Sequence, residues 1–117
     1  MRHRSKKKIL DRKKAPRKAL LRGLATSIIL YEKIKTTEAK AKAVKPIVEK
    51  LVTTAKKNDL TTRRKLLSVL YHKNAVNKAL EVLGPRYQDR PGGYTRIVKL
   101  GKRQGDGAEI VQIEFVK

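Results

Sequence analysis

Apolar residues recur at intervals of three and four along most of the chain, the spacing that places them on one face of an α-helix. This pattern predicts four helices, over about 16–31, 38–57, 59–70 and 76–83. The stripes that define them are, in order, Leu20, Leu21, Leu24, Ile28 and Tyr31; Val44, Ile47, Val48, Leu51 and Ala55; Leu60, Leu66, Leu67 and Leu70; and Val76, Ala79, Leu80 and Leu83. Each helix is expected to bury its stripe and leave its charged residues in solvent.

Residues at the predicted helix boundaries support this division. Thr37 and Asp59 are expected to cap the second and third helices, because their side-chain oxygens can accept hydrogen bonds from free backbone N–H groups. Pro46 lies inside the second stripe and is expected to kink or loosen that helix near residues 43–45 without ending it. The pair Gly84-Pro85 is expected to end the fourth helix, with glycine in a left-handed turn.

Elsewhere the pattern alternates with a period of two, which is typical of strands. The sequence predicts a short edge strand over 33–37 and two longer strands over 94–100 and 109–116. The glycine-rich segment 101–107 between the longer strands predicts an antiparallel hairpin with a basic tip, in which Asp106 is a turn residue. The expected fold is therefore α+β: a basic N-terminal extension, a helix, a short strand, three helices and a two-stranded hairpin, with the helices packed on one face of a small mixed sheet.

The first residues differ from the rest of the chain in their density of positive charge. The chain has 31 Lys and Arg against 10 Asp and Glu, a net charge of +21. Residues 1–18 hold ten of these cations and one acid, and besides Met1 their only large apolar residues are Ile9 and Leu10. So little apolar surface cannot offset the entropy of ordering the backbone. We expect residues 1–15 to be an extension ordered by a polyanion, most commonly nucleic acid, and residues 16–117 to form a single domain.

Candidate catalytic and metal-binding chemistry is sparse. Cysteine is absent, and the two histidines, His3 and His72, have no second ligand at metal spacing, so exposed or phosphate-facing roles are favoured for them. The pair Gly105 and Gly107 joins two strands, whereas a phosphate-binding loop leads into a helix. No serine or threonine lies in a nucleophile motif, and no apolar run reaches the length of a membrane span. We expect no enzyme, no cofactor, no small-molecule substrate and no membrane partner.

The segment 85–96 interleaves three arginines and two tyrosines around Gly92-Gly93. Arginine pairs with phosphate and stacks on bases, and tyrosine can stack or donate a hydrogen bond. The alternative is a turn in which Tyr94 packs at the edge of the sheet and the arginines are solvated. On a chain of this charge we favour contact with RNA.

Four sequence segments together resemble a known family. They are Met1-Arg2-His3-Arg4, the run from Ile34 to Lys42, the segment from Pro85 to Arg96 with its Gly-Gly-Tyr-Thr-Arg, and Arg103-x-Gly105-Asp106-Gly107-Ala108. In this order they resemble the family of the seventeenth protein of the bacterial large ribosomal subunit. The resemblance implies a structural component that binds large-subunit ribosomal RNA near the polypeptide exit region, beside neighbouring large-subunit ribosomal proteins. It also implies the cytoplasmic ribosome, with an organelle ribosome less favoured.

The leading hypothesis is thus an RNA-binding assembly protein that neutralises phosphates and reads RNA shape. The alternatives are a nucleoid-type basic DNA-binding protein and, less favoured, a cationic peptide of the membrane surface. The residues predicted to contact RNA are Arg2, His3, Arg4, Lys6, Lys7, Lys8, Arg12, Lys13, Lys14, Arg17, Lys18, Arg22, Lys35, Arg86, Tyr87, Arg90, Gly92, Gly93, Tyr94, Arg96, Lys102 and Arg103.

Overall fold

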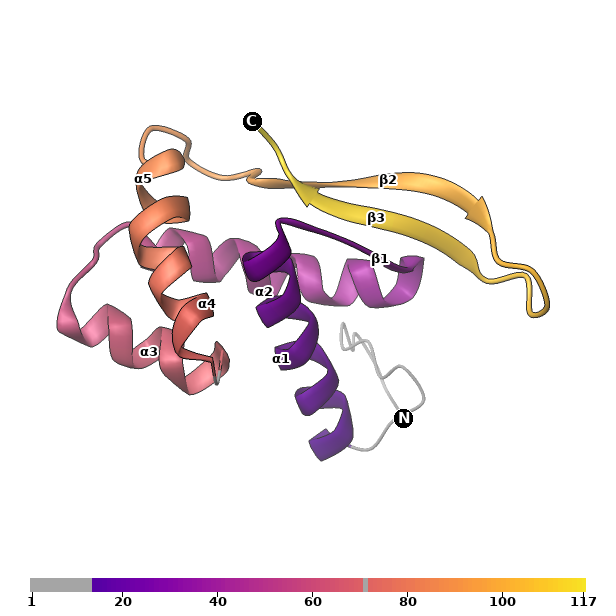
Figure 1. The fold of residues 1–117 in the computed structure, drawn as a ribbon, viewed down its shortest axis with the longest axis horizontal. Helices are drawn as coiled ribbons and strands as arrows, with labels where there is room; N and C mark the ends of the chain where they lie inside the picture. The colour runs from indigo at the N-terminus through magenta and orange to yellow at the C-terminus, as the bar shows by residue number, and fades with distance from the viewer. Residues whose placement is uncertain (1–13, 71) are drawn as a thin grey trace, which may run out of the picture.

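Helices on one side and a small sheet on the other make up the part of the chain that the computed structural model describes, residues 14–70 and 72–117 (Figure 1). The elements are α1 (Lys14–Tyr31), β1 (Lys33–Thr37), α2 (Glu38–Ala55), α3 (Leu60–Leu70), α4 (Lys73–Lys78), η1 (Ala79–Leu83), α5 (Gly84–Arg86), β2 (Thr95–Lys102) and β3 (Glu109–Phe115). The predicted α+β class and element order are confirmed. The centre is α2, which contacts all three strands as well as α1, α3, η1 and α5.

The sheet has the strand order β1-β3-β2, and both of its strand pairs are antiparallel. The expectation of a mixed sheet was therefore wrong. A tight hairpin forces β2 and β3 to be antiparallel, but periodicity carries no information about the direction in which β1 joins β3. The predicted hairpin is confirmed, and in Figure 1 it extends beyond the helices.

The core forms where the predicted stripes meet the sheet. The stripes of α2 and of the helix after residue 73 are buried or nearly so, as are Val111, Ile113 and Phe115 on one face of β3. Three predicted core residues lie outside it: Tyr31 is 70% exposed, and Leu60 and Leu67 of α3 are 63% and 49% exposed. Tyr31 is the last residue of α1 and Leu60 the first residue of α3, and Leu67 follows the buried Leu66.

The predicted end of the fourth helix at Gly84-Pro85 was also wrong. α4, η1 and α5 form one uninterrupted helical run, and Gly84 has a right-handed φ of −55°. Gly84 is buried against α2: a Cβ there would lie 2.9 Å from the carbonyl oxygen of Ala55. Pro85 follows Gly84 in this run and has no N–H to donate to the preceding turn, yet the run continues through Arg86. The absence of a side chain at Gly84 allows this helical run to approach α2 closely.

The other helix boundaries agree with the predictions only in part, because the helix predicted to begin at residue 76 already begins at Lys73. The backbone N–H of Thr62 donates to Oδ1 of Asp59 over 2.7 Å, so Asp59 caps α3, and this bond lowers the pKa of Asp59. Thr37 occupies the N-cap position of α2 with extended backbone, although its side chain makes no capping bond. α2 continues through Pro46 to Ala55.

The predictions for residues 1–13 lie outside the described residues. The boundary at residue 15 stays a prediction, although α1 already begins at Lys14. In the described part of the chain, no helix is both long and apolar enough to cross a membrane.

Candidate nucleic-acid interface

The face of the sheet turned away from the helices carries basic side chains. Directly paired residues in a sheet point to the same face, and Ile113 and Val111 of β3 point into the core. Their neighbours on β3 therefore point outward with the residues paired to them. We call this set the outer sheet face; it consists of Lys33, Glu114 and Arg96 in one row and Lys35, Gln112 and Val98 in the next.

The one acid of the outer sheet face is engaged within the protein. Nη2 of Arg96 donates to Oε2 of Glu114 over 3.0 Å, and the side-chain amide of Gln112 donates to its Oε1 over 2.9 Å. The hydrogen bond from Gln112, followed by that from Arg96 and the charge of Lys33, lowers the pKa of Glu114. The outer sheet face thus carries three cations, Lys33, Lys35 and Arg96, against one anion, and all three cations are exposed. The face can meet phosphate with a net positive charge.

The hairpin tip presents a second basic group, Lys102 and Arg103, both exposed. The guanidinium of Arg103 donates to both carboxylate oxygens of Asp106, one of them over 3.1 Å, and the N–H of Ala108 also donates to Asp106. These bonds, the one from Arg103 first, lower the pKa of Asp106 to about 2. Asp106 is thus the turn residue that was predicted. It also fixes the direction of a guanidinium whose other N–H groups remain available to a ligand.

The arginines of segment 85–96 are tied to the fold as well. Arg86 binds Glu32, which Lys78 also contacts over 3.1 Å. Arg90 donates from Nη2 to the backbone oxygen of Lys117 over 3.0 Å. Both arginines are exposed, so each presents part of its guanidinium to solvent in a fixed orientation.

The two tyrosines of this segment belong to the core. Tyr87 and Tyr94 are 2% and 0% exposed, and their ring centroids are 5.2 Å apart. Tyr87 donates from its hydroxyl to the backbone oxygen of Val116, and the hydroxyl of Tyr94 pairs with that of Thr53 over 3.0 Å. Rings buried in this way cannot stack on a base. Their geometry agrees with the packing alternative, so in this segment we propose RNA contact only for the exposed arginines and for the two glycines.

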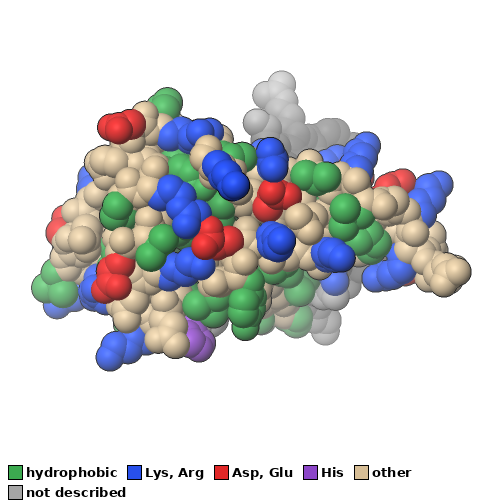
Figure 2. Space-filling view, turned by 45° about the horizontal axis from the view of Figure 1, so that its top comes forward, with side chains coloured by type: hydrophobic (Ala, Val, Ile, Leu, Met, Phe, Trp, Pro, Cys, Tyr) green, Lys and Arg blue, Asp and Glu red, His purple; other side chains and the backbone are tan. Residues whose placement is uncertain are grey.

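The α1 cations that were predicted to contact RNA lie on a different element from the residues of the outer sheet face. Lys14 and Lys18 are exposed, and Arg17 and Arg22 are half-buried. The predicted contacts of the extension lie outside the described residues; they are Arg2, His3, Arg4, Lys6, Lys7, Lys8, Arg12 and Lys13. Figure 2 shows Lys and Arg side chains spread over one face of the molecule as far as the projecting hairpin, with Asp and Glu among them.

Comparison with known proteins decides the family. The family model described as ribosomal protein L17 matches residues 20–116. The chain belongs to the ribosomal protein L17 family. It is 54% identical over 118 residues to the large ribosomal subunit protein bL17 of Hydrogenobaculum sp., covering 100% of both chains. It is 53% identical to bL17 of Rickettsia bellii, covering 99% of this chain and 82% of the relative. It is 51% identical to bL17 of Carboxydothermus hydrogenoformans, covering 92% and 96%.

Two exposed cations on the strands of this L17-family chain are absent from the predicted RNA contacts. Lys33 lies on the outer sheet face in the row of Glu114, and Lys99 is paired with Val111 on the opposite face, near Glu38. The period of the predicted strand would have placed Lys33 beside Lys35, because residues two apart share a face. Lys99 had no such signal, since the sequence does not show that the sheet extends beyond the helices.

Proposed function

We propose that this chain is a structural constituent of the large ribosomal subunit that binds its ribosomal RNA and supports assembly of the subunit. The observation that carries the proposal is family membership over almost the whole chain, on a molecule with a net charge of +21. The exposed cations of the outer sheet face and the hairpin tip supply a surface for phosphate. The location near the polypeptide exit region, in the cytoplasmic ribosome and beside other large-subunit proteins, is taken over from the family.

Phosphate neutralisation supplies most of the affinity in this proposal, and RNA shape supplies the specificity. Arg86, Arg96 and Arg103 each donate to an acid of the same chain, so their orientation is set before RNA arrives. Less side-chain entropy is then lost on binding. Residues 1–15 extend this surface as a basic segment that RNA orders.

The salt dependence of binding tests this mechanism. If the protein neutralises about ten phosphates, log affinity for large-subunit ribosomal RNA falls against log salt with a slope of about −7 to −9. Filter binding with the full chain at several KCl concentrations measures the slope. A slope shallower than about −3 contradicts phosphate neutralisation as the main source of affinity.

A nucleoid-type DNA-binding role is the alternative to be tested. Crosslinking in growing cells, followed by recovery of the chain and sequencing of the attached nucleic acid, separates the two partners. We expect large-subunit ribosomal RNA. Recovery of mainly chromosomal DNA contradicts the proposal.

A further inference from the structure

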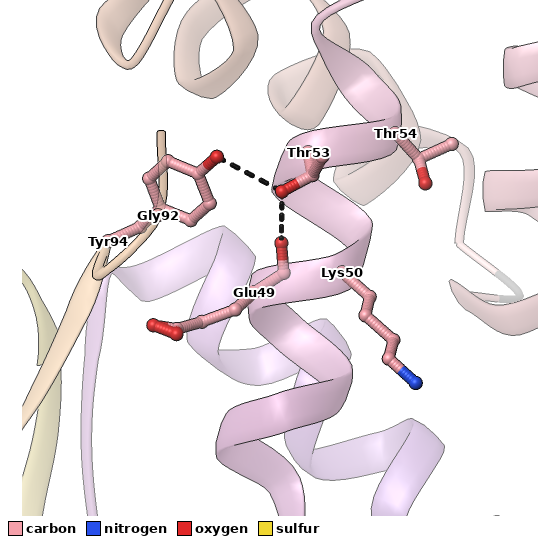
Figure 3. Close-up of a pocket in the computed structure, with 6 residues that line it drawn as sticks. All are labelled: Glu49, Lys50, Thr53, Thr54, Gly92 and Tyr94. Atoms are coloured by element: carbon pink, nitrogen blue, oxygen red, sulfur yellow. Dashed lines mark hydrogen bonds between the residues drawn. The ribbon is translucent and has the colours of Figure 1, made fainter. Parts of the chain in front are cut away.

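A hollow of about 370 Å³ lies between α2 and the loop that leads into β2 (Figure 3). It is lined by Glu49, Lys50, Thr53, Thr54, Gly92 and Tyr94. In Figure 3 the side chain of Glu49 extends on the side of α2 where Tyr94 lies, and Lys50 extends in another direction. The volume falls in the range of ligand pockets, roughly 300–1,000 Å³. The size and position of the hollow suit one small group of a larger partner.

Gly92 keeps one wall of the hollow without a side chain. Its φ lies outside the left-handed region that favours glycine, unlike that of Gly93, which is +65°. A Cβ at Gly92 would meet no atom within 4 Å. Neither backbone strain nor packing within the described chain therefore requires glycine here. Another physical reason for glycine at this position is that it lets a partner approach the backbone closely.

Glu49 adds an unsatisfied polar atom beside the same hollow. Its Oε1 is buried and accepts no hydrogen bond from the described residues. Leaving a buried charged acceptor without a donor is costly, and a partner N–H group that enters the hollow can supply the donor after a small rotation of the side chain. The hydroxyls of Thr53 and Tyr94 already pair with each other and do not fill this role.

The surroundings of the hollow are basic. Lys50 is exposed, and Nζ of Lys56 lies 4.9 Å from the ring centroid of Tyr94 while it donates to the backbone oxygen of Arg90. These cations outnumber the single acid of the lining and oppose the entry of a Lys or Arg side chain from a protein. A nucleotide suits both the unsatisfied acceptor of Glu49 and the surrounding cations, because it joins an N–H-bearing base to anionic phosphates.

We propose that this hollow receives one unpaired guanine of the bound RNA. Its N1–H and N2–H groups donate side by side to the carboxylate of Glu49, its ring passes the bare backbone of Gly92, and its flanking phosphates face Lys50 and Lys56. Guanine fits best because it carries two adjacent donors on one edge, as a carboxylate requires. This inference rests on the proposed binding of ribosomal RNA and adds a base-specific contact to it.

Chemical probing of assembled subunits tests the contact. Kethoxal reacts with N1 and N2 of unpaired guanine, the edge that Glu49 would cover. Large subunits are purified from cells whose own copy carries Glu49→Gln or Gly92→Leu, and adducts are mapped by reverse transcription. We expect the same guanine to become about ten-fold more reactive in both variants, since Glu49→Gln removes the charged acceptor and Gly92→Leu blocks the path of the ring towards it.

Gly23→Leu is the matched control, because a Cβ at Gly23 also meets no atom within 4 Å but lies on α1. It should leave that guanine protected, and mass spectrometry confirms that each variant is present in the subunit. Glu49→Gln preserves side-chain shape and guards against a folding effect of the leucine.

Three results overturn the inference: no guanine gains reactivity, different guanines respond in the two variants, or only adenine and cytosine sites respond to dimethyl sulfate. In these cases the chain is still present in the subunits, so the proposed function stands. Absence of even the wild-type chain from purified large subunits would instead contradict the proposed function.

Discussion

At the scale of single residues, Glu32 joins four parts of the fold. It lies between α1 and β1 with a φ of +65°. Its carboxylate binds Arg86 and Lys78, its N–H donates to the oxygen of Ile28, and its carbonyl accepts from Phe115 of β3. The hydrogen bond from Arg86 outweighs desolvation and, with Lys78, lowers the pKa of Glu32 from 4.5 to about 2.

We predict that Glu32→Gln lowers the free energy of unfolding at pH 7 by about 1 kcal/mol, because solvent screens a carboxylate that is 38% exposed. A carboxylate whose pKa is depressed by folding stabilises the protein above its unfolded pKa. The difference between wild type and variant should therefore be complete above about pH 5 and disappear as the pH falls towards 2. Urea unfolding at a series of pH values measures it.

Glu81→Gln is the control for this experiment, since Glu81 is exposed and shows no ion pair in the described chain. Its effect on the free energy of unfolding should be small. A Glu32→Gln difference that persists unchanged at pH 2 would mean that the ion pairs of Glu32 are not its source.

At the scale of elements, the packing of the 73–86 helical run on α2 depends on Gly84. We predict that Gly84→Ala lowers the free energy of unfolding by about 1–3 kcal/mol, because the added methyl overlaps backbone at Ala55 that has little room to move. Gly23→Ala, on an open surface of α1, should instead raise it by about 0.5–1 kcal/mol through helix propensity. Thermal unfolding of both variants gives the comparison, and equal effects of the two would argue against the close approach.

Gly84-Pro85 also illustrates which features of the fold the sequence could not predict. Apolar periodicity located every helix and strand, because burying one face requires that spacing whatever the tertiary arrangement. Gly84-Pro85 has the local signature of a helix end, but contact with α2 keeps it helical, and local rules do not include such contacts. The direction of β1 and the exposure of Leu67 likewise depend on which other elements pack against them.

The candidate interface was less predictable than the fold. Interleaved arginine and tyrosine in segment 85–96 suits both a binding loop and a packed turn, and burial separates the two. Tyr94 is in the core, and Arg86 and Arg90 are tied to Glu32 and Lys117. These partners are distant in sequence, so composition could not reveal them.

At the scale of the whole molecule, affinity should depend on where cations lie and not only on their number. We predict that the double variant Lys33→Gln/Lys35→Gln makes the salt slope of RNA binding less negative by about 1.4–1.8, because two phosphate contacts of the outer sheet face are lost. Filter binding to large-subunit ribosomal RNA at several salt concentrations measures the slope.

The double variant Lys65→Gln/Lys73→Gln removes the same charge from exposed positions on α3 and α4, away from the sheet. It should change the slope much less. If both double variants shift it equally, the protein binds through its overall charge and the outer sheet face has no special part.

The position of β3 in the sheet has a consequence for synthesis. Among the strands that the structure describes, β1 pairs only with β3, so residues 33–37 must wait for residues 110–114, more than seventy positions later. A nascent chain can form α1 and α2 while it is being translated, but its sheet stays incomplete until β3 leaves the tunnel. During that interval the polar edge of β1 lacks its partner, and lysines at positions 33 and 35 discourage pairing with other chains.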